Sequence, residues 1–353
     1  MRTPITADPP TGIDVTVVVP VYNEEKHIHA CVESITLQDF PKSCWEVLFV
    51  DGGSGDQTRA ILNSYMEQFS YMALLDNPRR TAPCAMNIGI RAARGRYIVR
   101  LDAHTTYAYD YVSACVYYLE KTGADNVGGP TVPVGSGLRQ SAIAAGYLSA
   151  FALGGGKQHN PFYEGFVDTV SFGAFRKQSL LQAGLYDEYF TRNQDDELNY
   201  RIQKMGGRIY QTPDIRFYYA PRASFPALAK QYFQYGAWKV SIIRKHKKPA
   251  RLTHLIPVLF VLFLLAGVPA SLCWRDAAVC YGALLSLYAS LTVYCSFSSR
   301  HAKGMAAKLL LCWVHVILHV SYGAGFLTGL FTRRYPSAGR PQGQTQRPRS
   351  QGL

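Results

Sequence analysis

Acidic residues are scarce in this sequence, and the shortage is concentrated at one end. The 353 residues include 24 Asp or Glu against 37 Lys or Arg, and from Ala237 onward 15 basic residues stand against a single acid, Asp276. The first 236 residues hold the remaining 22 basic and 23 acidic residues, a net charge of −1. The basic excess belongs to the C-terminal third, a pattern typical of a membrane-proximal segment, so we expect no nucleic acid as a partner.

Cysteine motifs for metal or redox chemistry are also missing. The eight cysteines form no Cys-x-x-Cys pair and no His-x-Cys cluster, which excludes the usual zinc and dithiol signatures. The polar, proline-containing start predicts no cleavable signal peptide, so we expect a cytosolic N-terminal part with reduced thiols. Charged residues are 17% of the chain and hydrophobic residues 48%, which excludes global disorder and indicates membrane segments.

Strand-then-helix units fill the first 121 residues. The β-branched run at 15–19 predicts a central strand buried on both faces, followed by a helix at 24–37 with Glu24 and Glu25 in its first turn. Three further units pair strand 45–50 with helix 57–69, strand 71–75 with helix 82–93, and strand 96–101 with helix 110–121. This alternation predicts an α/β fold with an open, mostly parallel, doubly wound sheet. Ligands bind such sheets beyond the carboxyl ends of the strands, which makes 20–24, Asp51 and 102–104 site candidates.

The alternation lapses after Asn126. A helix is predicted at 138–153, another at 195–205, a strand at 208–211, and an aromatic stretch at 217–219. We expect this half to supply loops and a lid more than a second core.

Three apolar segments close the chain, at 255–274, 278–297 and 305–331, and each reaches the roughly 20 residues that cross a bilayer. Basic residues at 244–248 and 300–308 flank the first two segments, so the positive-inside rule places the N-terminal domain on the cytoplasmic face of the cell membrane. A third crossing would put the basic tail outside, which the same rule disfavours. Two or three spans therefore stay open, with a re-entrant or interfacial third segment as the alternative.

The end of the first strand, residues 19–25, offers an aromatic ring and acids where a dinucleotide-binding fold would show G-x-G-x-x-G. Such a turn fits a site that stacks a nucleotide base. An ordinary helix cap is the alternative.

Asp102 and His104 follow the fourth strand, and residues i and i+2 there share one face. The pair suits Mg²⁺ or Mn²⁺ completed by substrate phosphates. The alternative is a capping Asp beside a hydrogen-bonded His.

Asp195, Asp196 and Glu197 precede a short amphipathic helix. A carboxylate held there is a suitable general base for a hydroxyl nucleophile, while capping alone is the alternative.

A segment at 231–239 places Tyr232, Tyr235, Trp238 and Lys239 on roughly one helical face just before the basic cluster. It predicts an interfacial helix under lipid headgroups, with an ordinary packed helix end as the alternative.

Together these motifs resemble the inverting glycosyltransferases of family 2 with the GT-A fold, and most of all their succinoglycan glucosyltransferase ExoA-like subgroup. The resemblance covers about residues 14–250. It rests on Val19-Pro20-Val21-Tyr22-Asn23-Glu24-Glu25, Val50-Asp51-Gly52-Gly53-Ser54, Asn87-x-Gly89, Leu101-Asp102-Ala103-His104, Gln194-Asp195-Asp196-Glu197-Leu198 and Gln231-Tyr232-Phe233-x-Tyr235-Gly236.

The resemblance implies roles for individual residues. Asp195 would be the general base, and Asp102 with His104 would hold the metal, Mg²⁺ or Mn²⁺. Gln194 stands where the family has a first acid, and Gly52 where it more often has a second Asp. The nucleotide-sugar site would include Pro20, Tyr22, Glu24, Asp51, Arg80 and Asp102, and the acceptor or donor loop Gly173, Gln194, Asp196, Glu197 and Gln231.

The resemblance also implies the reaction, transfer of a sugar from a nucleotide-sugar donor to a hydroxyl of a lipid-linked saccharide acceptor. Transfer to a polyprenyl phosphate and a non-catalytic membrane scaffold are the alternatives. The expected domains are an N-terminal tail (1–13), a catalytic domain (14–230), a basic interfacial helix (231–254), a membrane domain (255–332) and a disordered basic tail (333–353).

Overall fold

A computed structural model describes residues 12–247 and 252–332, so the predictions for the first eleven residues and for the tail at 333–353 lie outside the described residues. An eight-stranded sheet forms the centre of the N-terminal part, in the order β3-β2-β1-β4-β9-β6-β10-β8. The predicted parallel strands are β1 (Val15–Val21), β2 (Trp45–Asp51), β3 (Met72–Asp76) and β4 (Tyr97–Arg100). Every residue of β2 is buried, as its apolar run requires for a strand covered on both faces.

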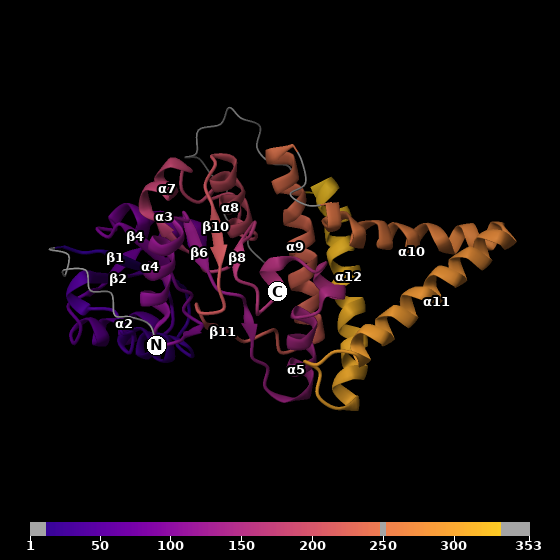
Figure 1. Ribbon diagram of the computed structural model, residues 1–353, viewed down its shortest axis with the longest axis horizontal. Coiled ribbons are helices and arrows are strands. Elements are labelled where there is room, and N and C mark those ends of the chain that lie inside the picture. The colour runs from indigo at the N-terminus through magenta and orange to yellow at the C-terminus, as the bar shows by residue number, and fades with distance from the viewer. Residues whose placement is uncertain (1–11, 248–251, 333–353) are drawn as a thin grey trace.

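Helices cover both faces of this sheet (Figure 1). They are α1 (Ile28–Thr36), α2 (Thr58–Met66), α3 (Ala82–Ala92), α4 (Tyr111–Thr122), α7 (Lys177–Gln182) and α8 (Gln194–Lys204). Ile28 and Tyr111 belong to the core on one face, and Met86 and Leu198 to the core on the other. The predicted doubly wound α/β fold is confirmed.

The first helix begins at Ile28, so the prediction that Glu24 and Glu25 lie in its first turn is wrong. Residues 24–27 form a turn in which the amides of His27 and Ile28 both bond to the Glu24 carbonyl at 2.9 Å. The Glu24 amide itself donates to Thr58 Oγ1 at 2.8 Å, across to the start of α2. This link holds Glu24 at the edge of the sheet, outside the helix.

The half after Asn126 extends the same sheet, where the sequence analysis expected mainly loops. It adds β6 (Asn126–Gly128), β8 (Gly165–Phe166), β9 (Ala174–Arg176) and β10 (Ile209–Gln211), of which only β10 was predicted. β9 lies antiparallel between β4 and β6. A separate small sheet pairs β5 (Thr106–Tyr107), β11 (Phe217–Tyr219) and β7 (Val132–Pro133).

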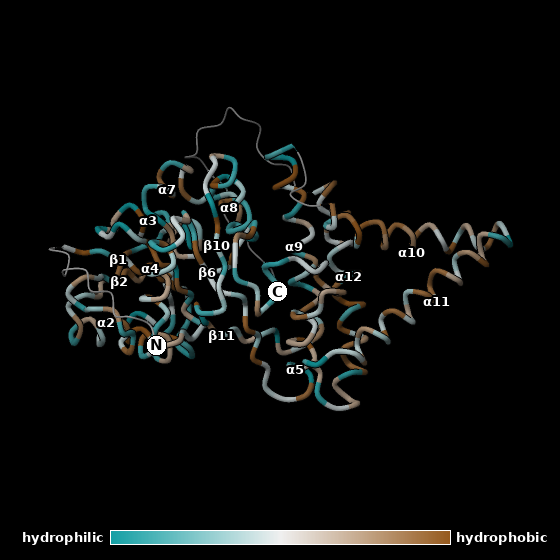
Figure 2. The backbone as a smooth tube through the Cα atoms, viewed as in Figure 1, coloured by the Kyte–Doolittle hydropathy of each residue, from teal (hydrophilic) through white to brown (hydrophobic). Residues whose placement is uncertain are grey.

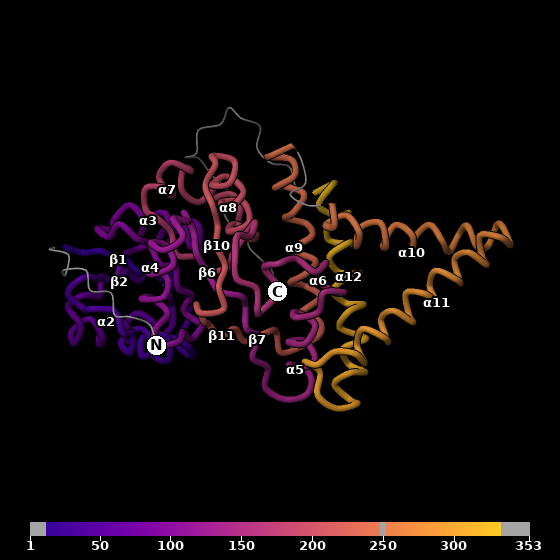
Figure 3. Tube along the Cα trace, in the orientation of Figure 1, coloured from indigo at the N-terminus to yellow at the C-terminus, as the bar shows by residue number. Residues whose placement is uncertain are grey.

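The C-terminal part consists of α9 (Phe225–His246), α10 (Ile256–Cys273), α11 (Arg275–Phe297) and α12 (Met305–Thr332). The last three are long and apolar enough to cross a membrane, which confirms the three predicted apolar helices. α10 and α11 project from the body as a hairpin, and hydrophobic residues dominate α10 (Figures 1 and 2). The helix predicted at 138–153 is divided into α5 (Gly137–Tyr147) and α6 (Ala150–Leu153), and both contact α12 (Figure 3).

The aromatic and cationic face predicted for an interfacial helix lies inside the protein. Tyr232, Trp238 and Lys239 of α9 are each less than a tenth exposed. Trp238 packs against the rings of Tyr189 and Phe190. This face of α9 therefore packs against other parts of the chain, Tyr232 against α5 and α12 and Trp238 against residues 189–190, and its burial argues against a face turned to lipid headgroups.

Candidate active site

The loops that follow β1 and β2 are joined by hydrogen bonds. The Asn23 amide donates to Ser54 Oγ at 2.9 Å, and Asn23 Oδ1 accepts from the Gly55 amide at 2.9 Å. Asn23 adopts the left-handed backbone conformation (φ 55°) that aims both groups at the second loop. The predicted residues at the ends of these two strands are thus brought to one edge of the sheet.

Asp51 is fully buried at the end of β2 and both of its oxygens are bonded. Oδ1 accepts from Ser54 Oγ at 2.5 Å, and Oδ2 accepts from the Gly53 amide at 3.1 Å and from Arg59 Nη1 at 2.7 Å. In this arrangement Asp51 shapes the loop after β2.

Tyr22 and Arg80 form an open aromatic and cationic pair beside that loop. Tyr22 is 44% exposed, and Arg80 Cζ lies 5.9 Å from the centre of its ring. A Cβ on Gly52 would lie 3.1 Å from a ring carbon of Tyr22, so the glycine that replaces the family's second Asp lets the ring lie close to the loop. Pro20 lies beside Val50 in the register of β1 and β2, at the base of the same loops.

A second group of candidate residues lies at the same edge of the sheet and consists of Asp102, His104 and Glu24. His104 Nδ1 lies 3.3 Å from Glu24 Oε1, and the hydrogen bond to Glu24 raises the pKa of His104. Among the described residues no group of three or more His, Cys, Asp or Glu converges. The carboxylate and imidazole fit Mg²⁺ or Mn²⁺ as two donors, which leaves the other coordination positions for diphosphate oxygens.

Arg100 joins the predicted metal-binding residue to the predicted base, and it was not among the residues predicted from the sequence. It ends β4, is 3% exposed, and lies 5.4 Å from the Phe172 ring. Its Nη1 donates to Asp195 Oδ1 at 2.5 Å, and its Nε donates to Asp102 Oδ1 at 3.1 Å. An arginine two residues before a strand-end Asp-x-His was the available signal, because a buried cation requires carboxylate partners.

Asp195 lies in the first turn of α8, one residue after Gln194, which begins the helix. Asn193 precedes them with a left-handed backbone (φ 57°), and its Nδ2 donates to the Tyr235 carbonyl of α9 at 3.1 Å. Burial raises the pKa of Asp195, with Arg100 opposing the shift. A carboxylate with this shift and a fixed position is suited to accept a proton.

The next two acids point to α9. Lys239 Nζ donates to Asp196 Oδ2 at 2.7 Å, and Lys245 Nζ lies 2.6 Å from Glu197 Oε1. Burial alone would raise the pKa of Glu197, but hydrogen bonds from His246 and Arg201 lower it to about 2. Asp196 and Glu197 therefore fasten the helix that carries Asp195 to α9.

Gly173 and Gln231 lie on either side of this region. The Gly173 carbonyl accepts from the Arg100 amide at 3.2 Å, and a Cβ on Gly173 would come within 2.1 Å of Asn126 Oδ1. Gln231 is buried among tyrosine hydroxyls, accepting from Tyr147 Oη at 2.8 Å and donating to Tyr235 Oη at 3.0 Å. Both residues contact protein groups that frame the site.

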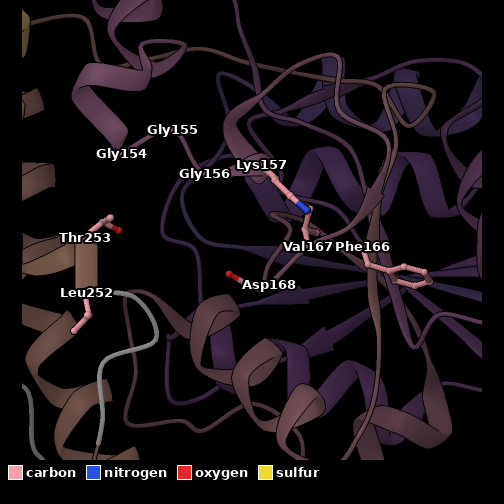
Figure 4. A pocket seen from close by; sticks show the side chains of 9 residues that line it. All are labelled: Gly154, Gly155, Gly156, Lys157, Phe166, Val167, Asp168, Leu252 and Thr253. Carbon is pink, nitrogen blue, oxygen red and sulfur yellow. The ribbon is translucent and has the colours of Figure 1, made fainter.

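A cavity of about 600 Å³ separates the catalytic part from the start of α10 (Figure 4). Lys157, Phe166 and Asp168 line one side, and Leu252 and Thr253 line the other. Thr169, next to Asp168, bonds to Asp196 at 3.2 Å. The cavity thus lies between the helix that carries Asp195 and the first apolar helix.

Known proteins resemble this chain in sequence and in fold. The family model "Glycosyl transferase family 2" matches residues 16–183. The chain is 30% identical to the succinoglycan biosynthesis protein ExoA of Rhizobium meliloti, over 94% of this chain and 99% of that protein. It is 26% identical to a dolichyl N-acetyl-alpha-D-glucosaminyl phosphate glucuronosyltransferase of Methanococcus voltae, over 89% of this chain and 98% of that protein.

The structural comparison supports the same fold. The mannosyltransferase PcManGT of Pyrobaculum calidifontis, solved with GDP-Man and Mn²⁺, aligns with a TM-score of 0.59 at 21% identity, over 95% of this chain and 92% of that one. The predicted GT-A fold is confirmed, and the extent of the match to ExoA confirms the predicted family and subgroup. The chain belongs to glycosyltransferase family 2 and is an enzyme of that class.

Proposed function

We propose that this glycosyltransferase moves a sugar from a nucleotide-sugar donor to a hydroxyl of a lipid-linked saccharide, with inversion at the anomeric carbon. The observation that carries the proposal is the bridge from Asp195 through Arg100 to Asp102, with 2.5 and 3.1 Å hydrogen bonds. It fixes the candidate base beside the candidate diphosphate site. A displacement from the face opposite the leaving group requires that arrangement.

In this mechanism Asp195 takes the proton of the acceptor hydroxyl as the oxygen bonds to the anomeric carbon. The bond from that carbon to the diphosphate oxygen breaks, and its electron pair leaves with the diphosphate. A divalent cation, held by Asp102 and His104, would offset the charge of the leaving group. Tyr22 would stack on the base, while Arg80 and Glu24 would complete the nucleotide-sugar site.

Two features support a lipid-linked acceptor, and a third supports the side of the membrane on which transfer takes place. The cavity next to Asp168 opens beside the start of α10, where a membrane-bound substrate would arrive. The two relatives described above are named for succinoglycan biosynthesis and for transfer to a dolichyl-linked sugar phosphate. Basic residues at 244–247 and 300–308 favour a catalytic domain on the cytoplasmic face of the cell membrane.

The proposal includes domain bounds and supporting roles. We propose the domain bounds that the sequence predicts, a catalytic domain at 14–230, a basic segment at 231–254 and a membrane domain at 255–332. Asp51 would support the nucleotide loop from behind, and Asp196 and Glu197 would hold α8 in place. Transfer to a polyprenyl phosphate itself is the second candidate, because such a lipid would reach the same cavity beside the start of α10.

The test is sugar transfer in membranes supplied with a panel of UDP- and GDP-sugars and extracted lipid acceptors. Wild type should transfer the sugar of one of these donors. Asp195→Asn should lower kcat by about 10³-fold with little change in donor KM. Glu120→Gln is the matched control, since Glu120 lies in α4, is half-exposed and bonds Tyr97 and Arg176 away from the site. Equal transfer by Asp195→Asn and wild type, or no transfer by wild type with any donor, would contradict the proposal.

A further inference from the structure

α12 is apolar enough to span a bilayer, yet it packs along the catalytic part of the chain. A Cβ on Gly146 of α5 would come within 2.5 Å of Val314. His315 Nε2 lies 2.9 Å from Ser149 Oγ, and His319 Nε2 lies 3.0 Å from the Phe151 carbonyl oxygen. The middle of α12 is therefore attached to α5 and α6.

α9 runs parallel to α12 from its first half to its last turn. Leu228, near the start of α9, lies in one cluster with the first half of α12. A Cβ on Gly236 would meet the Tyr322 carbonyl oxygen at 2.1 Å, and Arg244 Nη2 donates to the Leu330 carbonyl at 2.6 Å. The two helices are in contact at both ends of α9.

The C-terminal end of α9 is in turn held at the active site. Lys245, the neighbour of Arg244, pairs with Glu197 at 2.6 Å, two residues from Asp195. The last turn of α12 thus lies level with the helix that carries the candidate base. If α12 crossed the bilayer, that base and the ion pairs around it would lie in or beyond the membrane, where unshielded charges are costly.

Among the described residues, α10 and α11 contact α12 along the half of each helix that is nearer to it, out to Phe260 and to Tyr288, whose hydroxyl lies 3.0 Å from His319 Nδ1. Pro257 and Ser296, at the base of the hairpin, meet Gly323 and His315. Farther out, Gly267 packs on Tyr281 of the other hairpin helix. The apolar windows of α10 and α11 are 11% and 6% buried, against 44% for α12.

The outward face of α12 is an apolar stripe. Leu309, Trp313 and Phe331 are 57%, 55% and 82% exposed, and Val316 and Val320 continue the stripe at helical spacing. Its chain neighbours on the N-terminal side are the basic residues of the α11–α12 loop. An apolar face with flanking cations is typical of a helix that lies in the membrane surface.

We propose that α12 lies along the bilayer surface with this stripe in the lipid, so that the chain crosses the membrane twice, through α10 and α11. Thr332 and the basic tail after it are then on the same side as the catalytic domain. This decides between the two-span and three-span alternatives. The two-span proposal rests on the membrane attachment in the proposed function and does not depend on which donor, acceptor or catalytic base the enzyme uses.

The test uses a membrane-impermeant maleimide on full-length chains in intact cells and in inverted vesicles. The four cysteines of the membrane helices (Cys273, Cys280, Cys295 and Cys312) are changed to Ser, leaving buried thiols at 31, 44, 84 and 115. One reactive position is then supplied at a time: Thr332→Cys, Ser299→Cys in the α11–α12 loop, or native Cys273 at the tip of the hairpin. A size-exclusion profile in detergent that matches wild type shows that each chain folds.

We expect Thr332→Cys to label in the same preparation as Ser299→Cys, and Cys273 to label in the opposite one. Labelling of position 332 together with Cys273, or labelling from neither side, would overturn the two-span proposal. Either result leaves the proposed sugar transfer standing. Loss of transfer by wild type, in contrast, would leave the labelling pattern unchanged.

Discussion

Replacement of Arg100 by Met tests whether a buried cation holds the catalytic groups in place. The change keeps an unbranched side chain that can fill much of the buried space, and it removes the hydrogen bonds to Asp195 and Asp102, at 2.5 and 3.1 Å. Two carboxylates would then share the site with no cation between them. Their mutual repulsion and the lost geometry should both impair catalysis.

The burial of Arg100 and its two partners determines how much folding stability the change should remove. Arg100 is 3% exposed, whereas the Asp102 and Asp195 side chains are 17% and 23% exposed, so water can solvate the carboxylates in part. Removal of one partner from a buried pair costs about 3–5 kcal/mol, and partial solvation should reduce this to about 2–3 kcal/mol of folding stability. Because Asp195 loses its fixed position, kcat should fall about 10²-fold or more, while donor KM changes little.

Three measurements separate a positioning role from general damage. The acid limb of the pH–rate profile should move to higher pH, because Arg100 opposes the burial that raises the pKa of Asp195 and only the ionised carboxylate accepts a proton. Binding of Mn²⁺ alone, followed by electron paramagnetic resonance, should tighten, since a competing cation beside Asp102 is gone. Arg100→Lys should recover part of kcat.

A matched control is Arg176→Met, because Arg176 is a half-buried arginine that bonds backbone carbonyls at 2.6 and 3.1 Å on the far side of β9. It should lower the unfolding midpoint without moving the pH profile or Mn²⁺ binding. The reasoning is refuted if Arg100→Met keeps kcat within twofold of wild type, or if its loss of activity comes with an unchanged profile and unchanged Mn²⁺ affinity.

Three further predictions address the fastening of α8, the core and the nucleotide site. Glu197→Gln should lower the free energy of unfolding by on the order of 2–3 kcal/mol at neutral pH. Because the pKa of Glu197 in the folded protein is about 2, the stability that wild type gains from the ionised carboxylate should be lost as pH falls from about 4.5 to 2, as measured by denaturant titrations. Gly89→Ala should destabilise by about 1–3 kcal/mol, since its Cβ would lie 2.4 Å from Val18 Cγ1, and calorimetry should show partial rescue when Val18→Ala is added. Tyr22→Ala should raise donor KM about tenfold, because stacking of a base on an aromatic ring contributes about 1–3 kcal/mol of binding free energy. Tyr22→Phe keeps the ring and should have a donor KM near that of wild type. An equal donor KM for both variants would remove Tyr22 from the base site.

The sequence predicts the parallel half of the sheet because its strands are long apolar runs with a clear helix after each. β6, β8 and β9 escaped prediction because β6 and β9 have three residues each and β8 has two. Segments that short carry no periodicity. Their pairing depends on distant contacts, such as the 2.8 Å bond between the buried amides of Asn126 and Asn199, which connects β6 to α8.

The candidate residues at the ends of strands could be predicted from the sequence, whereas the residues that hold them in place could not. Position after a strand was enough to select Asp102, and position at the start of a predicted helix selected Asp195. Arg100 escaped because its partner Asp195 is 95 positions away, so no local pattern shows that the guanidinium has a carboxylate to pair with. Asp196 is a similar case, since only the fold brings Lys239 to it at 2.7 Å and shows that this acid already has a cation partner.

α12 shows why apolar length and membrane crossing are separate properties. A hydropathy window gives the same answer for a helix surrounded by lipid and for one that is half in lipid and half against protein. The difference lies in which residues occupy the inner face: Gly325 and Gly329 let α9 approach so closely that a Cβ would come within 2.0 Å of Phe233 and 2.7 Å of Ala237 backbone oxygens. His315 on the same helix is fully buried against serine hydroxyls. Glycines four residues apart with a polar residue on the inner side indicate a protein contact, and the basic tail that follows then stays on the side where the positive-inside rule favours it.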